Sequence, residues 1–125
     1  MNEYFGKHLR LCQKNDIRNV LKSGRKARLG FFIVSCVPNS FQFDRYGIIL
    51  SRKHGNAVRR NRIKRIYREI LRKNKIMQAP YFDILIRPLY GKKIEYRCIL
   101  KEYSEWLKKL KERNQANMKG YSTSE

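Results

Sequence analysis

Basic side chains are concentrated between Arg52 and Lys73, and they carry the chemistry that this sequence displays most clearly. The segment holds ten Lys or Arg residues and a single acid, Glu69. Seven of the ten are Arg, whose planar guanidinium forms paired hydrogen bonds with phosphate oxygens and base edges. Surface helices usually carry both signs of charge at i, i+4 spacing, so cations in such excess repel one another until a polyanion is bound. The composition of this segment therefore favours a phosphate-binding surface over an ordinary solvated one.

Acidic and histidine residues are not arranged for catalysis. A nuclease needs carboxylates that hold a metal ion, or a histidine that transfers protons. The ten acids form no close cluster, and His8 and His54 stand apart in the sequence. We therefore expect no catalytic residue, no metal ligand and no cofactor bound by the protein itself. Asp83 is expected to be a satisfied or edge acid of a strand, and His54, next to Gly55, a turn residue that can contact phosphate.

The three cysteines do not form a recognisable site. Cys12, Cys36 and Cys98 are odd in number and far apart, with no CxxC spacing. We interpret them as reduced thiols rather than disulfide partners or zinc ligands.

The basic segment has the spacing of an amphipathic helix. Gly55 is expected to break the chain just before it, and Asn56 is a candidate N-cap. Apolar residues recur at helical spacing and form one stripe: Ile63, Ile66, Tyr67, Ile70 and Leu71. The opposite face carries Asn61, Arg65, Arg68 and Arg72, with Lys64 at its border. One face is thus expected to pack on a core while the other stays available for a ligand.

Other elements follow from runs of apolar residues and from turn signals. A first helix is expected to begin at a cap of Asn15 or Asp16 and to end at Gly24. A last helix is expected over about 94–111, with Tyr103 and Trp106 in its apolar stripe. Strands are expected at 25–28, 31–37, 46–51 and 81–86. The strands at 31–37 and 46–51 are expected to form a hairpin, and those on either side of the basic helix a parallel pair.

The expected fold class is α+β, with helices packed on a mixed sheet in the order helix, strands, helix, strand, helix. We expect a flexible tail at 1–8, one RNA-binding domain at 9–113 and a disordered tail at 114–125. A length of 125 residues suits one domain with a modest core.

Net charge restricts the classes of partner. The chain has 30 basic and 10 acidic residues, a formal charge of +20, which points to nucleic acid or an anionic surface. No apolar run approaches the roughly 20 residues of a membrane span, and the first residues lack the apolar run of a signal peptide. We expect a cytoplasmic protein with no membrane partner. A small ribosomal protein, another structured-RNA-binding protein or a DNA-binding protein would share this charge and size. A helix-turn-helix is disfavoured by the strand expected just before Gly55.

The sequence GNAVRRNRIKRIYRE at 55–69 resembles the signature of the protein subunit of bacterial ribonuclease P. The Arg-Asn-Arg core of that signature stands here at 60–62, followed by Lys64, Arg65 and Arg68. The resemblance is long and ungapped, and it extends from about Leu9 to Leu110. A ribosomal protein would not need this motif after a strand.

The resemblance implies a division of labour between protein and RNA. In this family the RNA subunit is catalytic and uses Mg²⁺ to cleave the 5′ leader from precursor tRNA. The protein subunit binds the catalytic RNA and the leader. Carried to this chain, the RNA-binding residues are Arg52, Lys53, Asn56, Arg60, Asn61, Arg62, Lys64, Arg65 and Arg68. The resemblance also implies a left-handed strand–helix–strand crossover. Asn56 has the alternative of acting only as a helix cap.

A cleft for the leader is implied between the first helix and the sheet. Its candidate residues are Ile17, Leu21, Phe31 and Ser35. The family often has aromatic residues at such positions, so base stacking there is not expected to be strong in this chain. Ile17 and Leu21 have the alternative of being core residues. Phe31 is expected to share the strand face of Ser35, whereas Phe32 should point into the core.

Overall fold

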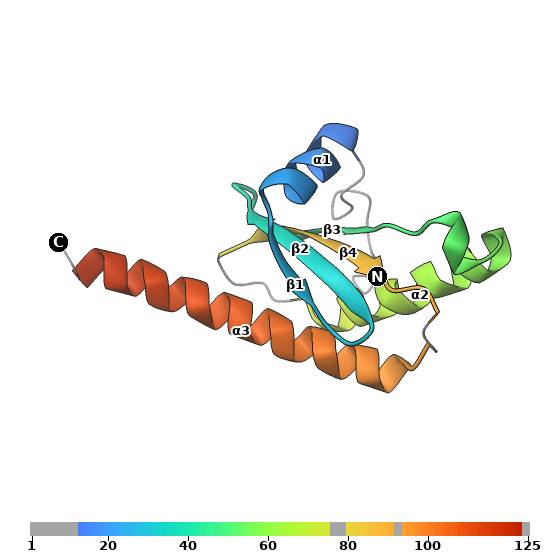
Figure 1. Ribbon diagram of the computed structural model, residues 1–125. Coiled ribbons are helices and arrows are strands. Elements are labelled where there is room, and N and C mark those ends of the chain that lie inside the picture. The colour runs from blue at the N-terminus through green and yellow to red at the C-terminus, as the bar shows by residue number, and fades with distance from the viewer. Residues whose placement is uncertain (1–12, 76–79, 92–93, 124–125) are drawn as a thin grey trace.

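The computed structural model describes residues 13–75, 80–91 and 94–123, with side chains as far as Arg113. A four-stranded sheet has helices on both faces (Figure 1). In chain order the elements are α1 (Lys14–Ser23), β1 (Arg25–Arg28), β2 (Phe32–Pro38), β3 (Arg45–Ile48), the 3-10 turn η2 (Arg52–His54), α2 (Ala57–Lys73), β4 (Phe82–Pro88) and α3 (Tyr96–Thr123). The expected α+β class and helix order are confirmed.

The sheet is mixed, with strand order β1-β2-β4-β3. β2 pairs antiparallel with β1 and β4, whereas β3 pairs parallel with β4. The parallel pair expected on either side of the basic helix is therefore confirmed. The expected hairpin of β2 and β3 is wrong, because β4 lies between them. β4 is apolar enough to be buried on both faces, which suits a central position in a sheet with helices on either side.

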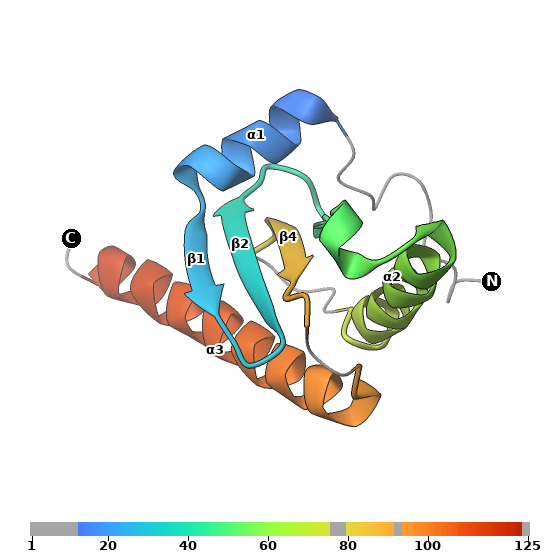
Figure 2. The same cartoon turned by 45° about the vertical axis from the view of Figure 1, so that its right-hand side comes forward.

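The larger core lies between the sheet and helices α2 and α3 (Figure 2). β2 contributes Phe32, Val34 and Cys36 to this core. The ring of Phe32 meets Tyr67 of α2 edge to face, with 5.9 Å between ring centroids, and lies 6.4 Å from the ring of Tyr103 on α3. The expected core positions of Phe32 and Tyr103 are confirmed.

The smaller core lies under α1, on the opposite face of the sheet. Val20 packs there with Val37 and Leu85, and the half-buried Ile17 and Leu21 lie against this cluster. Figure 2 shows α1 crossing one end of β1 and β2, while the rest of these strands extends beyond it.

Two boundaries differ from the sequence prediction. α1 begins at Lys14 after Gln13, which makes no side-chain cap, so the expected cap at Asn15 or Asp16 is wrong. Asp16 instead binds Arg45 of β3 at 3.2 Å, which ties α1 to the sheet edge. α3 runs on to Thr123, well past the expected end near 111, and no proline interrupts this stretch.

The predicted tail at 1–8 and the thiol of Cys12 lie outside the described residues. The domain limits at 9 and 113 stay predictions, as does the hand of the crossover. Of the other two cysteines, Cys36 is buried and Cys98 is exposed, and both are free thiols. Burial raises the pKa of the Cys36 thiol to about 11, which keeps it protonated at neutral pH.

Candidate nucleic-acid interface

The start of α2 is fixed by a compact set of hydrogen bonds. The Asn56 side chain accepts from the Arg59 backbone N–H at 2.9 Å, so the expected N-cap is confirmed. Gly55 has a φ of +112°, a conformation that other residues rarely adopt. One turn earlier, the Ser51 N–H donates to His54 Nδ1 at 3.0 Å. The chain is therefore held in one path as it enters the basic helix.

The two faces of α2 separate as the sequence predicted. Ile63, Tyr67, Ile70 and Leu71 are buried against the sheet and α3. Most of the polar and basic residues on the other face are exposed, whereas Arg60 and Lys64 are half-buried. The term "basic face" is used below for the residues that the sequence assigned to RNA binding on η2 and α2: Arg52, Lys53, Asn56, Arg60, Asn61, Arg62, Lys64, Arg65 and Arg68.

Charge on the basic face is poorly compensated within the protein. The acid of this segment, Glu69, is bound by Arg72 on the same helix. Its hydrogen bonds to Arg72 lower the pKa of Glu69, so it stays ionised and paired. Among the described residues, no ion pair involves Arg60, Arg62, Lys64 or Arg65. A run of cations held by a rigid helix can bind the phosphates of a polyanion at several points.

His54 does not have the role that the sequence suggested. Its ring is buried, and Nε2 donates to the Pro88 carbonyl oxygen at 2.6 Å. Because Nδ1 already accepts from Ser51, both ring nitrogens are used in fixing η2 to the end of β4. The expectation that His54 contacts phosphate is wrong, since no ring nitrogen is left for a ligand.

The four leader-cleft candidates are not all on the same face. Ile17, Leu21 and Ser35 lie on the α1 side of the sheet, where Ser35 is buried and its neighbour Val37 is in the smaller core. Phe31 instead packs on the larger core, and its carbonyl oxygen accepts from the Tyr67 hydroxyl at 3.5 Å. The expected alignment of Phe31 with Ser35 is wrong because Phe31 precedes β2, so strand alternation begins only at Phe32.

A second basic surface lies on the α1 side of the sheet, beyond the end that α1 covers. Strand pairing sets Lys26 beside Ser35, and Ile33 between Arg28 and Arg87. Ser35 Oγ and Arg87 Nε are buried, and neither has a hydrogen-bond partner among the described residues. We call Lys26, Arg28, Ile33, Ser35 and Arg87 the "sheet surface". Sequence reasoning missed its cations, although strand alternation in RKAR at 25–28 was the available signal.

Acids on the sheet serve structural roles. Arg45 donates to both carboxylate oxygens of Asp83, at 2.8 and 2.7 Å, and Asn39 donates to Oδ1 at 2.9 Å. The expected satisfied state of Asp83 is confirmed. Within the described ranges, no group of three or more His, Cys, Asp or Glu side chains is placed to hold a metal ion. Within the same ranges, no helix has the length and apolar character that a membrane span requires.

Comparison with known proteins agrees with this geometry. The family model described as Ribonuclease P matches residues 5–111. The chain belongs to this ribonuclease P family. Its curated relatives include the ribonuclease P protein component of Thermotoga maritima, 38% identical over 88 residues that cover 70% of this chain and 75% of that protein. The component from Desulforapulum autotrophicum is 34% identical over 107 residues, covering 85% and 92%.

Solved structures of ribonuclease P proteins have the same fold. The protein from Thermotoga maritima superposes with a TM-score of 0.71 at 30% identity, covering 80% of this chain and 96% of that one. The protein from Staphylococcus aureus gives a TM-score of 0.69 at 30% identity, covering 82% and 95%. The resemblance carried by residues 55–69 is thus confirmed. The ribosomal alternative is not favoured, and the chain is a protein component of the ribonucleoprotein that processes tRNA 5′ ends.

Proposed function

We propose that this ribonuclease P protein binds the catalytic RNA through the cations of the basic face of α2, while Asn56 caps the helix that carries them. The observation that carries the proposal is a row of cations, among which Arg60, Arg62, Lys64 and Arg65 form no ion pair with described residues. The opposite side of their helix is engaged in the core. Because Ile63, Tyr67, Ile70 and Leu71 fix the helix, its cations meet an RNA surface without first becoming ordered. Binding through phosphates also predicts a strong dependence on salt concentration.

Phosphodiester cleavage is assigned in this proposal to the RNA, acting with Mg²⁺ that the RNA holds. Four of the ten acids support this division by the groups that they already bind. Asp16 and Asp83 bind Arg45, and Glu69 binds Arg72. Glu102 accepts from the backbone N–H groups of Gly30 and Phe31, at 3.0 and 3.2 Å. These carboxylates hold the fold together, so the protein's part in the reaction is to bind and position RNA, in the cytoplasm where precursor tRNA is made.

The sheet surface is proposed to hold the 5′ leader of precursor tRNA. Lys26, Arg28 and Arg87 supply positive charge along neighbouring strands, and Ser35 Oγ and Arg87 Nε have hydrogen-bonding capacity to spare. Ile17 and Leu21 border this surface from α1. None of the five residues of the sheet surface is aromatic, so the leader would be held there through its phosphates and by aliphatic contacts rather than by stacking.

The test of this function is reconstitution with the ribonuclease P RNA. Cleavage of precursor tRNA is measured with the RNA alone, with RNA-free protein alone, and with both, over a range of Mg²⁺ concentrations. The proposal expects no cleavage by the protein alone, and cleavage by the two together at Mg²⁺ concentrations where the RNA alone is slow. Cleavage by RNA-free protein would contradict it.

A further inference from the structure

A small pocket lies where η2 and the start of α2 meet the connection from β4 to α3. Its walls include Phe31, Ile63 and Tyr67, and its rim is formed by Lys53, Arg59 and Tyr90. Tyr90 is 55% exposed, one of the few large apolar side chains of the described structure that open to solvent. An exposed aromatic ring at the rim of a pocket offers a platform on which a planar group can stack.

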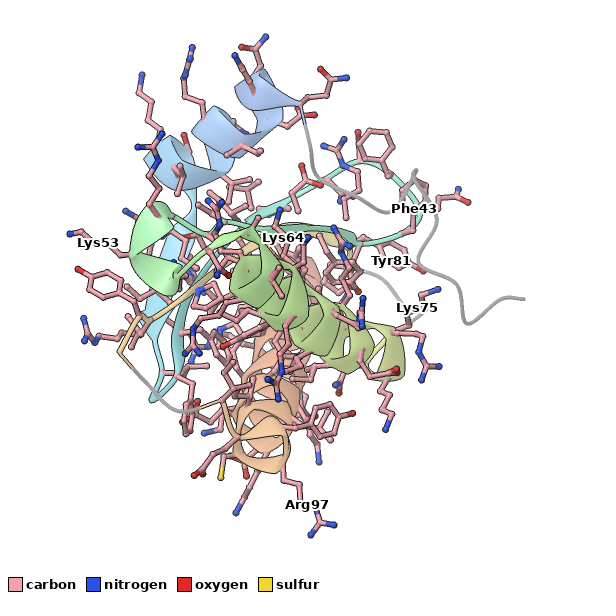
Figure 3. The ribbon with its side chains drawn as sticks, turned by 90° about the vertical axis from the view of Figure 1, so that its right-hand side faces the viewer. Phe43, Lys53, Lys64, Lys75, Tyr81 and Arg97 are labelled. Atoms are coloured by element: carbon pink, nitrogen blue, oxygen red, sulfur yellow. The ribbon has the colours of Figure 1, made fainter. Side chains whose placement is uncertain are left out.

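Lys53 lies against the Tyr90 ring. Its Nζ is 5.1 Å from the ring centroid, a cation–π distance, and it donates to the Tyr90 hydroxyl at 3.4 Å. The buried His54 ring meets Tyr90 edge to face, with 5.7 Å between centroids. His54 is hydrogen-bonded to Pro88, so it ties the segment that carries Lys53 to the segment that carries Tyr90. The Lys53 ammonium and the Tyr90 ring are therefore held close together. Figure 3 shows Lys53 on η2, at the outer edge of the molecule.

Arg59 is directed to the same pocket by Gly55. A Cβ on Gly55 would come within 2.5 Å of Arg59 Cδ and 3.2 Å of Arg59 Cβ, so the Arg59 side chain lies directly across the glycine. Glycine at position 55 therefore has a second consequence besides the turn, because the absence of a Cβ leaves space for the Arg59 side chain. Arg59 is exposed, and no described ion pair neutralises it.

The electrostatic character of the pocket is entirely positive. The residues that line it include Lys53 and Arg59 and no Asp or Glu. Phe41 offers a useful contrast, because it too is exposed and has a guanidinium, that of Arg45, 4.5 Å from its ring centroid. That guanidinium is already bound by Asp16 and Asp83, so an anion gains little there. Of the two exposed aromatic rings among the described residues, Phe41 and Tyr90, the Tyr90 ring is therefore the one whose neighbouring cations are in no ion pair.

We propose that this pocket binds one unpaired nucleotide of the catalytic RNA, with its base stacked on Tyr90 and its phosphate bound by Lys53 and Arg59. The assignment to the catalytic RNA rests on the proposed function, because the pocket adjoins the N-terminal end of the basic face. The sheet surface proposed for the leader lies on the other side of the sheet. Stacking on a protein aromatic ring is tolerant of base identity, whereas phosphate contacts are sensitive to salt.

The first experiment measures binding of the full chain to two labelled single-stranded probes, a decamer of uridylate and an abasic decamer with the same backbone. Replacing Tyr90→Leu is expected to weaken binding of the uridylate decamer about tenfold and to leave the abasic decamer unchanged. Tyr90→Phe should bind both as the original protein does, and Phe41→Leu should serve as a matched control without effect. Lys53→Ala should flatten the salt dependence by about 0.7 in log–log slope.

Two outcomes of that experiment would overturn the proposal. One is unchanged uridylate binding by Tyr90→Leu, and the other is an equal loss for both decamers, which would mean that no base stacks on the ring. Thermal melts of Tyr90→Leu and Tyr90→Phe serve as the control for folding. Melting temperatures equal to that of the original protein show that a loss of binding does not come from a loss of structure.

A second arm identifies the source of the nucleotide. Tyr90→Leu should weaken assembly with the ribonuclease P RNA and leave the assembled complex with its normal preference for precursor over mature tRNA. A lost preference with normal assembly would assign the pocket to the leader and overturn the assignment to the catalytic RNA. If the original protein fails to assemble with that RNA, the proposed function fails, whereas the decamer result still decides whether the pocket stacks a base.

Discussion

The Asp44 carboxylate and the Lys111 ammonium form an ion pair of 3.2 Å in the interior, with side chains only 2% and 7% exposed. The Phe82 backbone N–H also donates to Asp44 at 2.7 Å, and the Tyr46 hydroxyl donates at 3.4 Å. Burial raises the pKa of Asp44 and lowers that of Lys111, because desolvation opposes both charges. The pair joins α3 to the segments where β3 and β4 begin.

Replacing Lys111→Met is expected to lower the free energy of unfolding by about 3 kcal/mol near neutral pH, because it leaves a buried carboxylate without its cation. The Asp44 pKa in the folded variant then lies further above its unfolded value. A carboxyl group of this kind binds its proton more tightly in the folded state, so stability falls as pH rises through that range. The free energy of unfolding that Lys111→Met loses should therefore be smaller at about pH 4.5 than at about pH 7. Denaturant unfolding at the two pH values measures it.

The double variant Asp44→Asn with Lys111→Met is the control for that experiment. It removes both charges, so most of the lost stability should return. A deficit of Lys111→Met that is equal at both pH values would show that the loss comes from packing and not from the stranded charge.

Asn56 is expected to act through its cap at the start of α2. Asn56→Ala should lower the free energy of unfolding by about 1 kcal/mol, whereas Asn56→Ser should keep the cap and the stability. We expect Asn56→Ser to bind the catalytic RNA like the original protein. A stable Asn56→Ser variant with weakened RNA binding would instead show that the Asn56 side chain contacts RNA directly.

The sheet surface is tested by replacing Lys26→Ala and Arg28→Ala together. The assembled complex should lose affinity for precursor tRNA, with a salt slope flatter by about 1.4 for two single-strand phosphate contacts. Its affinity for mature tRNA should not change. Arg25→Ala is the control, because Arg25 is exposed on the same strand and pairs with Cys36, so it belongs to the opposite face. An equal loss for precursor and mature tRNA would contradict a leader site.

The sequence predicted correctly those features that depend on residues within a single element. The stripe of α2, its break at Gly55 and its cap at Asn56 all follow from local spacing and local hydrogen bonding. The strand expected at 25–28 is also present as β1, and its polar and small residues suit its position at a sheet edge.

The sequence did not predict contacts between segments that lie far apart in the chain. β2 and β3 are close in the chain, but β4 takes the place between them, and nothing in the spacing of either strand shows this. His54 looked available for phosphate until Pro88 of β4 was placed against it, 34 residues away. The pocket at Tyr90 was missed for the same reason, because its cations come from η2 and α2 and its ring from beyond β4.

The basic face of α2 is the central claim, and equilibrium assembly with the ribonuclease P RNA over a range of salt tests it most directly. Arg62 and Arg65 are exposed on α2, and Lys101 and Lys108 are exposed on α3, so each double Ala variant removes two charges. Arg62→Ala with Arg65→Ala should weaken assembly at least about tenfold at about 150 mM salt and flatten the log–log slope by about 1.4–1.8. Lys101→Ala with Lys108→Ala should assemble like the original protein. Equal effects of the two double variants would mean that net charge, not the α2 face, drives binding, and would contradict the account.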